Sequence, residues 1–193
     1  MRVAPAAGEA ASDRAREFVM SFVRNFTLGC VVWIASCASG LAAKDKDAPA
    51  TTSGLPVPRY VSLKSDHVNV RAGPTKDQDV TWIYTRSGLP VEITAEFENW
   101  RRVRDSEGAE GWVYHSLLSG RRTAVITMKK KDDLAPIYDR ADSASGIAAK
   151  LQAGVVATVK RCNDGWCRIA GNGFDGWIEQ QRLWGVYADE KVN

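Results

Sequence analysis

The chain has 193 residues and a net charge of +3, with 45% hydrophobic and 25% charged residues, which is the balance of an ordinary globular protein. So small a net charge argues against a dedicated polyanion binder. The basic clusters at residues 101–104, 121–122 and 129–131 are best explained as solvated faces on which both signs of charge mix, so nucleic acid is not an expected partner.

The first 43 residues have the order of a secretory leader. Arg24 precedes an apolar run over residues 26–35, and small residues follow it. The run is far shorter than the about 20 residues that cross a bilayer as a helix. We therefore expect export, with cleavage after Ala42 or Ala43.

Two alternatives remain for this leader. Residues 34–37 resemble a bacterial lipobox, which would make Cys37 the acylated residue of a lipid-anchored protein. An uncleaved leader would itself be a membrane anchor. The segment before Met20 is unusually long for a leader, so Met20 is a second candidate start. A membrane is expected as a partner only through the leader or a lipid.

After the leader, residues 44–58 are rich in Lys, Asp, Ala, Thr, Pro and Gly and predict a flexible linker. From residue 59 the pattern changes to short β runs separated by turn residues. Apolar side chains at 91, 93, 95 and 97 alternate with polar ones, which is typical of a strand with one buried face. No segment has a helical period, so we expect an all-β fold.

The β region repeats itself. Trp100-Arg101-Arg102-Val103 and Gly111-Trp112-Val113 recur as Trp166-Cys167-Arg168-Ile169 and Gly176-Trp177-Ile178, with an offset of 66 residues at the first tryptophan and 65 at the second. This period exceeds the roughly 20–50 residues of solenoid repeats. Each copy is therefore predicted to be a small domain of its own. The predicted segments are a leader (1–43), a linker (44–58), a first domain (59–126), a second linker (127–134), a second domain (135–187) and a tail (188–193).

Asp164-Gly165 is a strong hairpin signal, because a two-residue type I′ turn needs a positive φ at both positions. With these two residues as the loop, Cys162 faces Cys167 across the hairpin at a distance that suits a disulfide. We expect that bond in an oxidising compartment, rather than a metal or redox site. The first copy has Glu96 and Arg101 at the equivalent positions, an opposite-charge pair.

The combined motifs resemble the bacterial SH3-like (SH3b) family, in its exported form with two tandem copies. The first copy carries Val68-Asn69-Val70-Arg71-Ala72-Gly73-Pro74, Gly88-Leu89-Pro90-Val91, Asn99-Trp100 and Gly111-Trp112-Val113. The second copy departs at its start, where Ala135-Pro136-Ile137-Tyr138 stands, and keeps the later motifs. The resemblance implies two tandem small SH3-like β-barrels. It is weak for function, because one small barrel carries many binding roles.

The resemblance also implies where a ligand would bind. In SH3-like domains the groove is lined by the aromatic residue that opens the third strand and by residues near the last strand. Trp100 and Trp166 hold the first place, and Trp112, Tyr114 and Trp177 lie near the second. These five residues are the candidate ligand-binding set. The alternative is that they cap the barrels or pack between the copies.

The alternation of side chains along a strand partly supports the prediction that these aromatics point away from the core. If Val103 and Val113 point into the core, Trp100 and Tyr114 point the other way. Pairing Glu96 with Arg101 then requires a bulge between the two strands. The proline-peptide binding mode of the eukaryotic relatives is not expected, because the segment 111–118 lacks the proline and second tyrosine on which that mode relies.

Groups for catalysis are not placed by any motif. His67 and His115 are the only histidines, and neither has a nucleophile set beside it by a recognisable pattern. We expect no enzymatic activity, no cofactor and no metal. The leading hypothesis is a binding module of the cell envelope, periplasmic, secreted or lipid-anchored, whose ligand is a peptidoglycan peptide or a periplasmic protein. The alternative is a structural or assembly factor whose aromatics bury at a domain or subunit interface; the sequence leaves the oligomeric state open.

Overall fold

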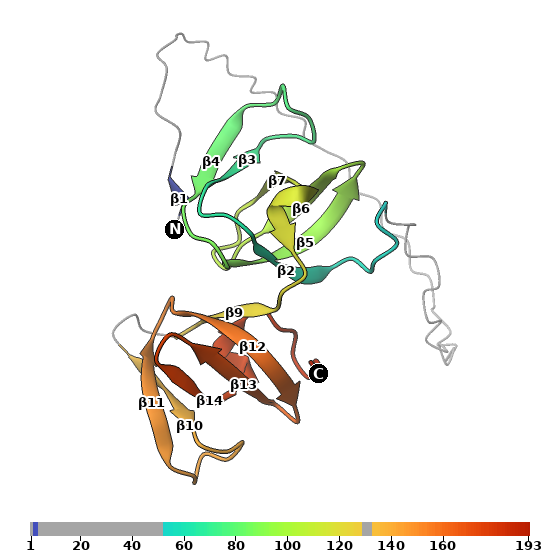
Figure 1. Cartoon of the computed structure of the whole chain (residues 1–193). Helices are drawn as coiled ribbons and strands as arrows, with labels where there is room; N and C mark the ends of the chain where they lie inside the picture. The colour runs from blue at the N-terminus through green and yellow to red at the C-terminus, as the bar shows by residue number, and fades with distance from the viewer. Residues whose placement is uncertain (1, 4–51, 129–132) are drawn as a thin grey trace, which may run out of the picture. The chain divides into compact units, whose positions relative to one another are not determined.

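The computed structural model of the protein describes residues 2–3, 52–128 and 133–193 (Figure 1). The predicted cleavage positions, the lipidation at Cys37, the Met20 start and most of the 44–58 linker lie outside these residues. Within them, no helix has the length and apolar character needed to cross a membrane.

The first copy is an antiparallel sheet with the strand order β1-β4-β3-β7-β6-β5-β2-β8 (Figure 1). Its elements are β1 (Arg2–Val3), β2 (Arg59–Leu63), β3 (Val68–Arg71), β4 (Val80–Tyr84), β5 (Pro90–Phe97), β6 (Trp100–Arg104), β7 (Glu110–Tyr114), the 3₁₀ turn η1 (His115–Leu117) and β8 (Leu118–Ser119).

The second copy has the order β11-β10-β14-β13-β12-β9-β15, which matches the first copy strand for strand once β1 is set aside. Its elements are β9 (Thr123–Ile126), β10 (Leu134–Tyr138), β11 (Ile147–Gln152), β12 (Val156–Asn163), β13 (Trp166–Gly171), β14 (Phe174–Glu179), η2 (Gln180–Arg182) and β15 (Leu183–Trp184). The predicted all-β duplication is confirmed.

The boundary between the copies falls earlier than the predicted residue 126. Strand β9 pairs with β12 and β15 of the second sheet, and its Ala124 and Ile126 are buried in the second core. It holds the place that β2 holds in the first copy. Because β9 is short and directly follows the first copy's last strand, the sequence pattern assigned it to the wrong domain.

The predicted hairpin of the second copy is confirmed. Asp164 and Gly165 have φ values of 51° and 78°, and Cys162 pairs with Cys167 in a disulfide whose Cα atoms lie 4.1 Å apart. In the first copy Glu96 pairs with Arg101, as expected. Cys162 also forms a bridge with Val192, so part of the predicted tail is held against the second sheet.

The predicted bulge between β5 and β6 is present, and it changes which side chains of β5 are buried. The register against β6 shifts between Ile93 and Ala95, so the strand changes face there. Ile93 is buried, but Phe97, predicted to share its face, is 49% exposed. The side chain of Glu96 is instead 1% exposed, with its Oε1 2.6 Å from Arg59 and 3.1 Å from Arg101. Ser53 donates two further hydrogen bonds to Glu96, so the end of the predicted flexible linker is fixed to the first copy.

Each sheet surrounds its own hydrophobic core. The first core consists of Val61, Leu63, Val68, Val70, Tyr84, Val91, Ile93, Val103, Val113 and Leu118. The second consists of Ala124, Ile126, Ala135, Ile137, Leu151, Ala157, Val159, Cys162, Cys167, Ile169, Ile178, Leu183 and Val186. Val113 of β7 and Ile178 of β14 lie in these cores, so their neighbours Trp112 and Trp177 are on the opposite face of each sheet.

Candidate functional site

In the first copy, two of the five candidate aromatics pack against each other. The ring centroids of Trp100 and Tyr114 lie 5.4 Å apart at an interplanar angle of 84°. Trp100 is outside the first core cluster, as strand parity predicted, yet it is only 8% exposed. Trp112 is partly buried on the same strand as Tyr114 and pairs across the sheet with Arg71 and Arg102. The first copy therefore offers Tyr114 and Trp112 rather than Trp100 to a ligand.

In the second copy, Trp166 and Trp177 are both partly exposed. Tyr138 meets Trp166 edge to face, with 5.7 Å between the ring centroids. The guanidinium carbon of Arg161 lies 5.7 Å from the ring centroid of Trp177, within the range of a cation–π contact. Each of the two rings thus has one neighbour in its own sheet, Tyr138 for Trp166 and Arg161 for Trp177.

The cross-strand partner of the first tryptophan differs between the copies. Trp100 is opposite Tyr114, whereas Trp166 is opposite Glu179. A carboxylate therefore stands beside Trp166 where an aromatic ring packs on Trp100.

A cavity of about 470 Å³ opens beside Trp166, a volume within the usual range of ligand sites. We call it the Trp166 pocket. It is lined by residues of the β12–β13 turn, of the strands and turn that follow, and of the chain after β15: Asp164, Gly165, Trp166, Glu179, Gln180, Gln181, Leu183, Val186, Ala188 and Asp189.

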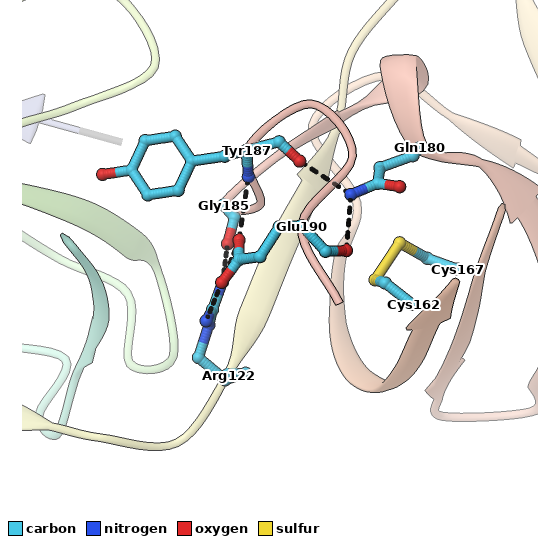
Figure 2. The surroundings of a disulfide bond; sticks show 7 residues. All are labelled: Arg122, Cys162, Cys167, Gln180, Gly185, Tyr187 and Glu190. Atoms are coloured by element: carbon cyan, nitrogen blue, oxygen red, sulfur yellow. Dashed lines mark hydrogen bonds and ion pairs between the residues drawn. A yellow bond between two sulfur atoms is a disulfide. The ribbon is translucent and has the colours of Figure 1, made fainter. Parts of the chain in front are cut away.

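Gln180 joins two walls of the Trp166 pocket. Its backbone N–H donates to the carbonyl of Gly165 at 2.8 Å. Its Nε2 donates to the carbonyls of Tyr187 and Glu190 at 2.7 and 3.0 Å (Figure 2). The residue is 5% exposed, and its Oε1 accepts no hydrogen bond from the described part of the chain. The two donated bonds of the amide thus fix the side chain between the β12–β13 turn and the chain after β15.

The chain after β15 is held in place by an ion pair, which we call the tail clamp (Figure 2). Arg122 donates to both oxygens of Glu190 at 2.6 and 3.0 Å and to the carbonyl of Gly185 at 2.9 Å. Glu190 also accepts the backbone N–H of Tyr187 at 2.9 Å. Burial alone would raise the pKa of Glu190, but the hydrogen bonds from Arg122 and Tyr187 outweigh it and lower that pKa. The clamp therefore fixes one wall of the Trp166 pocket.

The Trp166 pocket combines an apolar floor with an acidic rim. Leu183 and Val186 are 7% and 6% exposed at its base. Asp164, Glu179 and Asp189 supply carboxylates at its edge, of which Glu179 is paired with Arg182 at 2.6 Å. An aromatic ring, apolar contacts and uncompensated negative charge suit a peptide that carries an amino group. In the described segments, no three His, Cys, Asp or Glu side chains gather as metal ligands would.

Sequence reasoning identified Trp166 but missed the rest of this pocket. Gln180, Glu179 and Asp189 sit in a 3₁₀ turn, at a strand end and in the tail, where no periodic pattern marks them. The repeat itself could have indicated the position of Gln180, because Gln180 follows β14 as His115 follows the equivalent β7. In each copy the backbone N–H of this residue donates to a carbonyl of the hairpin turn.

Aromatic side chains of the two copies, which belong to one compact unit, also meet. The ring centroid of Tyr60 lies 5.4 Å from that of Trp184 and 4.6 Å from that of Tyr187. Burial and the nearby charge of Glu92 raise the pKa of Tyr60 to about 12. None of these three aromatics is in the candidate ligand-binding set.

Comparison with known proteins gives a match to a domain family. The family model of the bacterial SH3 domain matches two segments of the chain, residues 64–120 and 131–185. These segments contain most of the first and second sheets, respectively.

A curated relative is the Bacillus subtilis (strain 168) protein named "Putative N-acetylmuramoyl-L-alanine amidase YrvJ". It is 25% identical over 126 residues, which are 62% of this chain and 24% of that protein. The chain thus spans about a quarter of the length of this relative.

Among solved structures, NlpC2 from Trichomonas vaginalis is 20% identical with a TM-score of 0.30, and the match covers 67% of this chain and 49% of NlpC2. NlpC1 from the same organism is 19% identical with a TM-score of 0.30, and the match covers 69% of this chain and 48% of NlpC1.

Proposed function

This chain belongs to the bacterial SH3 domain family, and from that premise we propose that it is a non-catalytic binding module of the cell envelope. Its second copy binds a peptidoglycan peptide in the Trp166 pocket. The observation that carries this proposal is the pocket itself, in which a partly exposed tryptophan lies opposite a carboxylate and above buried apolar side chains.

Two further observations support the proposal. The curated relative is named for the bond between N-acetylmuramic acid and L-alanine, which is part of the cell wall, and the similarity covers about a quarter of that protein. The disulfide between Cys162 and Cys167 suits an oxidising compartment outside the cytoplasm. A module of this kind would keep a protein at the wall, and a second copy would add avidity if both contact one polymer.

The ligand class follows from the lining of the pocket. Stem peptides of peptidoglycan that are not cross-linked carry a free amino group on the side chain of their diamino acid, next to the small side chains of alanine. An ammonium group would be attracted by the carboxylates of Asp164, Glu179 and Asp189, and the small side chains would contact Trp166 and Leu183.

The test is sedimentation of the full chain with purified sacculi at low salt. We expect the protein in the pellet, and Trp166→Ala should weaken binding by about 10- to 30-fold, because truncation of a central tryptophan typically removes that much affinity. The matched control is Phe97→Ala, since Phe97 is an aromatic residue 49% exposed on the first copy and away from the pocket. Protein that stays in the supernatant, or equal losses for both variants, would show the proposal to be wrong.

The contact of Tyr60 with Trp184 and Tyr187 supports the alternative function of a structural or assembly factor. In that function the aromatics hold the copies together or bind a partner subunit. It predicts that Tyr60→Ala makes the chain unfold or change its oligomeric state in sedimentation velocity, while Trp166→Ala leaves both unchanged.

A further inference from the structure

The edge strand of the first sheet pairs with two residues from the N-terminus of the chain. Strand β1 pairs antiparallel with β4, with Arg2 opposite Tyr84 and Val3 opposite Ile83 (Figure 1). Without β1, β4 would be the edge strand of this sheet, as β11 is in the second. An edge strand presents unpaired backbone groups to which an extended peptide can add.

The side chain of Arg2 fits a set of three groups beside that edge. Its Nε lies 3.2 Å from Oδ2 of Asp105, and it forms a second ion pair with Glu107. Its guanidinium carbon lies 5.7 Å from the ring centroid of Trp82. We call Trp82, Asp105 and Glu107 the cation site.

The cation site is held in position by contacts of its own. Asp105 is 7% exposed, and its Oδ1 accepts the backbone N–H groups of Glu107 and Ala109 at 3.0 and 3.1 Å. Its Oδ2 accepts the hydroxyl of Tyr84 at 3.1 Å. The buried carboxylate is therefore oriented by its own loop and by β4, and Arg2 adds to an arrangement that these bonds maintain.

The chemistry of the site favours arginine. A planar guanidinium can pair with two carboxylates and lie over an indole ring at the same time, whereas an ammonium is a point charge that keeps its water more strongly. The hydrogen bond to Glu107 is the largest cause of a raised pKa at Arg2.

The second copy does not repeat these groups. Val70 faces Trp82 across β3 and β4, and the equivalent Ile137 faces Ala149. The site thus belongs to the first copy alone and is not a general product of the fold.

We propose that the edge of β4 together with the cation site binds an extended polypeptide segment that carries an arginine, and that Arg2–Val3 occupy this site in the precursor. If the leader is removed on export, as the sequence predicts, the two carboxylates lose the countercharge of Arg2. A segment of another protein then takes its place by strand addition. Because Arg2 and the cation site belong to the same chain, the internal segment has a high effective concentration at the site, and the precursor resists competition.

The experiment uses the purified full chain, with its intact N-terminus checked by mass. The probe is a fluorescent peptide with the sequence of residues 1–6, measured by anisotropy. In the Arg2→Glu chain, repulsion from the carboxylates empties the site. We expect this variant to bind the probe at least about tenfold more tightly than the unaltered chain, and not to bind a probe with glutamate in place of arginine.

Second substitutions in the Arg2→Glu chain locate the binding. Glu107→Gln changes an exposed side chain that leaves the fold intact, and Trp82→Leu removes the ring; each should weaken probe binding by about three- to tenfold. Asp175→Asn on the second sheet is the matched control and should change nothing. Equal binding by the unaltered and Arg2→Glu chains, no binding by either, or indifference to Glu107→Gln and Trp82→Leu would each overturn the proposal.

Discussion

Cys162 and Cys167 lie opposite each other on β12 and β13, at the register position that Glu96 and Arg101 hold on β5 and β6. A covalent bond and a buried ion pair thus join the same two strands in the two copies. Both pairs are close to a hairpin turn with a positive φ at its first residue, Asp164 in one copy and Glu98 in the other. The strength of each link can be measured separately.

Removal of the disulfide should destabilise the chain moderately. The bond closes a loop of sequence separation 5, for which the chain-entropy model gives about 2 kcal/mol. We expect the Cys162→Ser, Cys167→Ser double variant to lose about that much free energy of unfolding in urea. Because both sulfurs are buried, a loss near zero would contradict the model of a structural bond.

Glu96 should make the first copy sensitive to acid. Burial alone would raise the pKa of Glu96, but hydrogen bonds from Ser53 and Arg59 and the charge of Arg101 lower it. A lowered pKa in the folded state stabilises the protein above the unfolded-state pKa, and this is lost as the pH falls through the folded-state pKa. Glu96→Gln should therefore cost about 2–3 kcal/mol at pH 7 and progressively less in acid, measured by urea unfolding. Glu98→Gln in the adjacent exposed turn is the matched control and should cost little free energy of unfolding at pH 7.

The contribution of the tail clamp to the free energy of unfolding should depend on pH in the same direction as that of Glu96, but should be smaller. Glu190 also has a lowered pKa, so its contribution is present at neutral pH and lost as the pH falls through the folded-state value. Glu190→Gln should cost about 1 kcal/mol at pH 7 and should speed hydrogen exchange at Val192 and Cys162, whose backbone groups pair. If exchange there is unchanged, the ion pair does not hold the tail.

The glycines of the two Gly-Trp motifs should not tolerate alanine. A Cβ on Gly176 would lie 3.0 Å from the carbonyl oxygen of Tyr138, and one on Gly111 would clash with Val70. We expect Gly176→Ala and Gly111→Ala to cost about 1–3 kcal/mol each by thermal unfolding. Gly120→Ala is the control, because a Cβ there meets nothing within 4 Å.

The charge of Glu179 should determine part of ligand binding. Glu179→Gln removes one carboxylate from beside Trp166 and should weaken binding to sacculi about three- to tenfold at low salt, with a smaller difference at high salt. Acetylation of the free amino groups of the sacculi should abolish this difference between the two proteins. Persistence of the difference would mean that Glu179 does not act on a ligand amine.

Much of the fold could be predicted from local signals. The Asp164-Gly165 turn sets the register of its hairpin, and that register alone places the cysteines opposite each other. The duplicated Gly-Trp motifs likewise predicted two tandem small β domains. Predictions failed where a non-local contact decides the outcome. Strand β9 pairs with strands more than 25 residues away, and only that pairing assigns it to the second copy.

The candidate site was harder to predict than the fold. Strand parity gave the direction of Trp100 correctly, but the ring is buried because Tyr114 packs on it from the neighbouring strand. The predicted face of Phe97 was wrong because the alternating pattern was continued across the bulge. The pairing of Glu96 with Arg101 required a bulge but did not give its position, which is between Ile93 and Ala95. Gln180 and Glu190 act through hydrogen bonds to backbone carbonyls and to Arg122, which composition and period do not reveal.

The ion pair of Arg122 with Glu190 brings the entrance and the exit of the second copy to one place. A unit whose two ends meet can be inserted in series with little disturbance to its neighbours. Two such units can therefore follow each other along one chain with only a short connecting peptide between them.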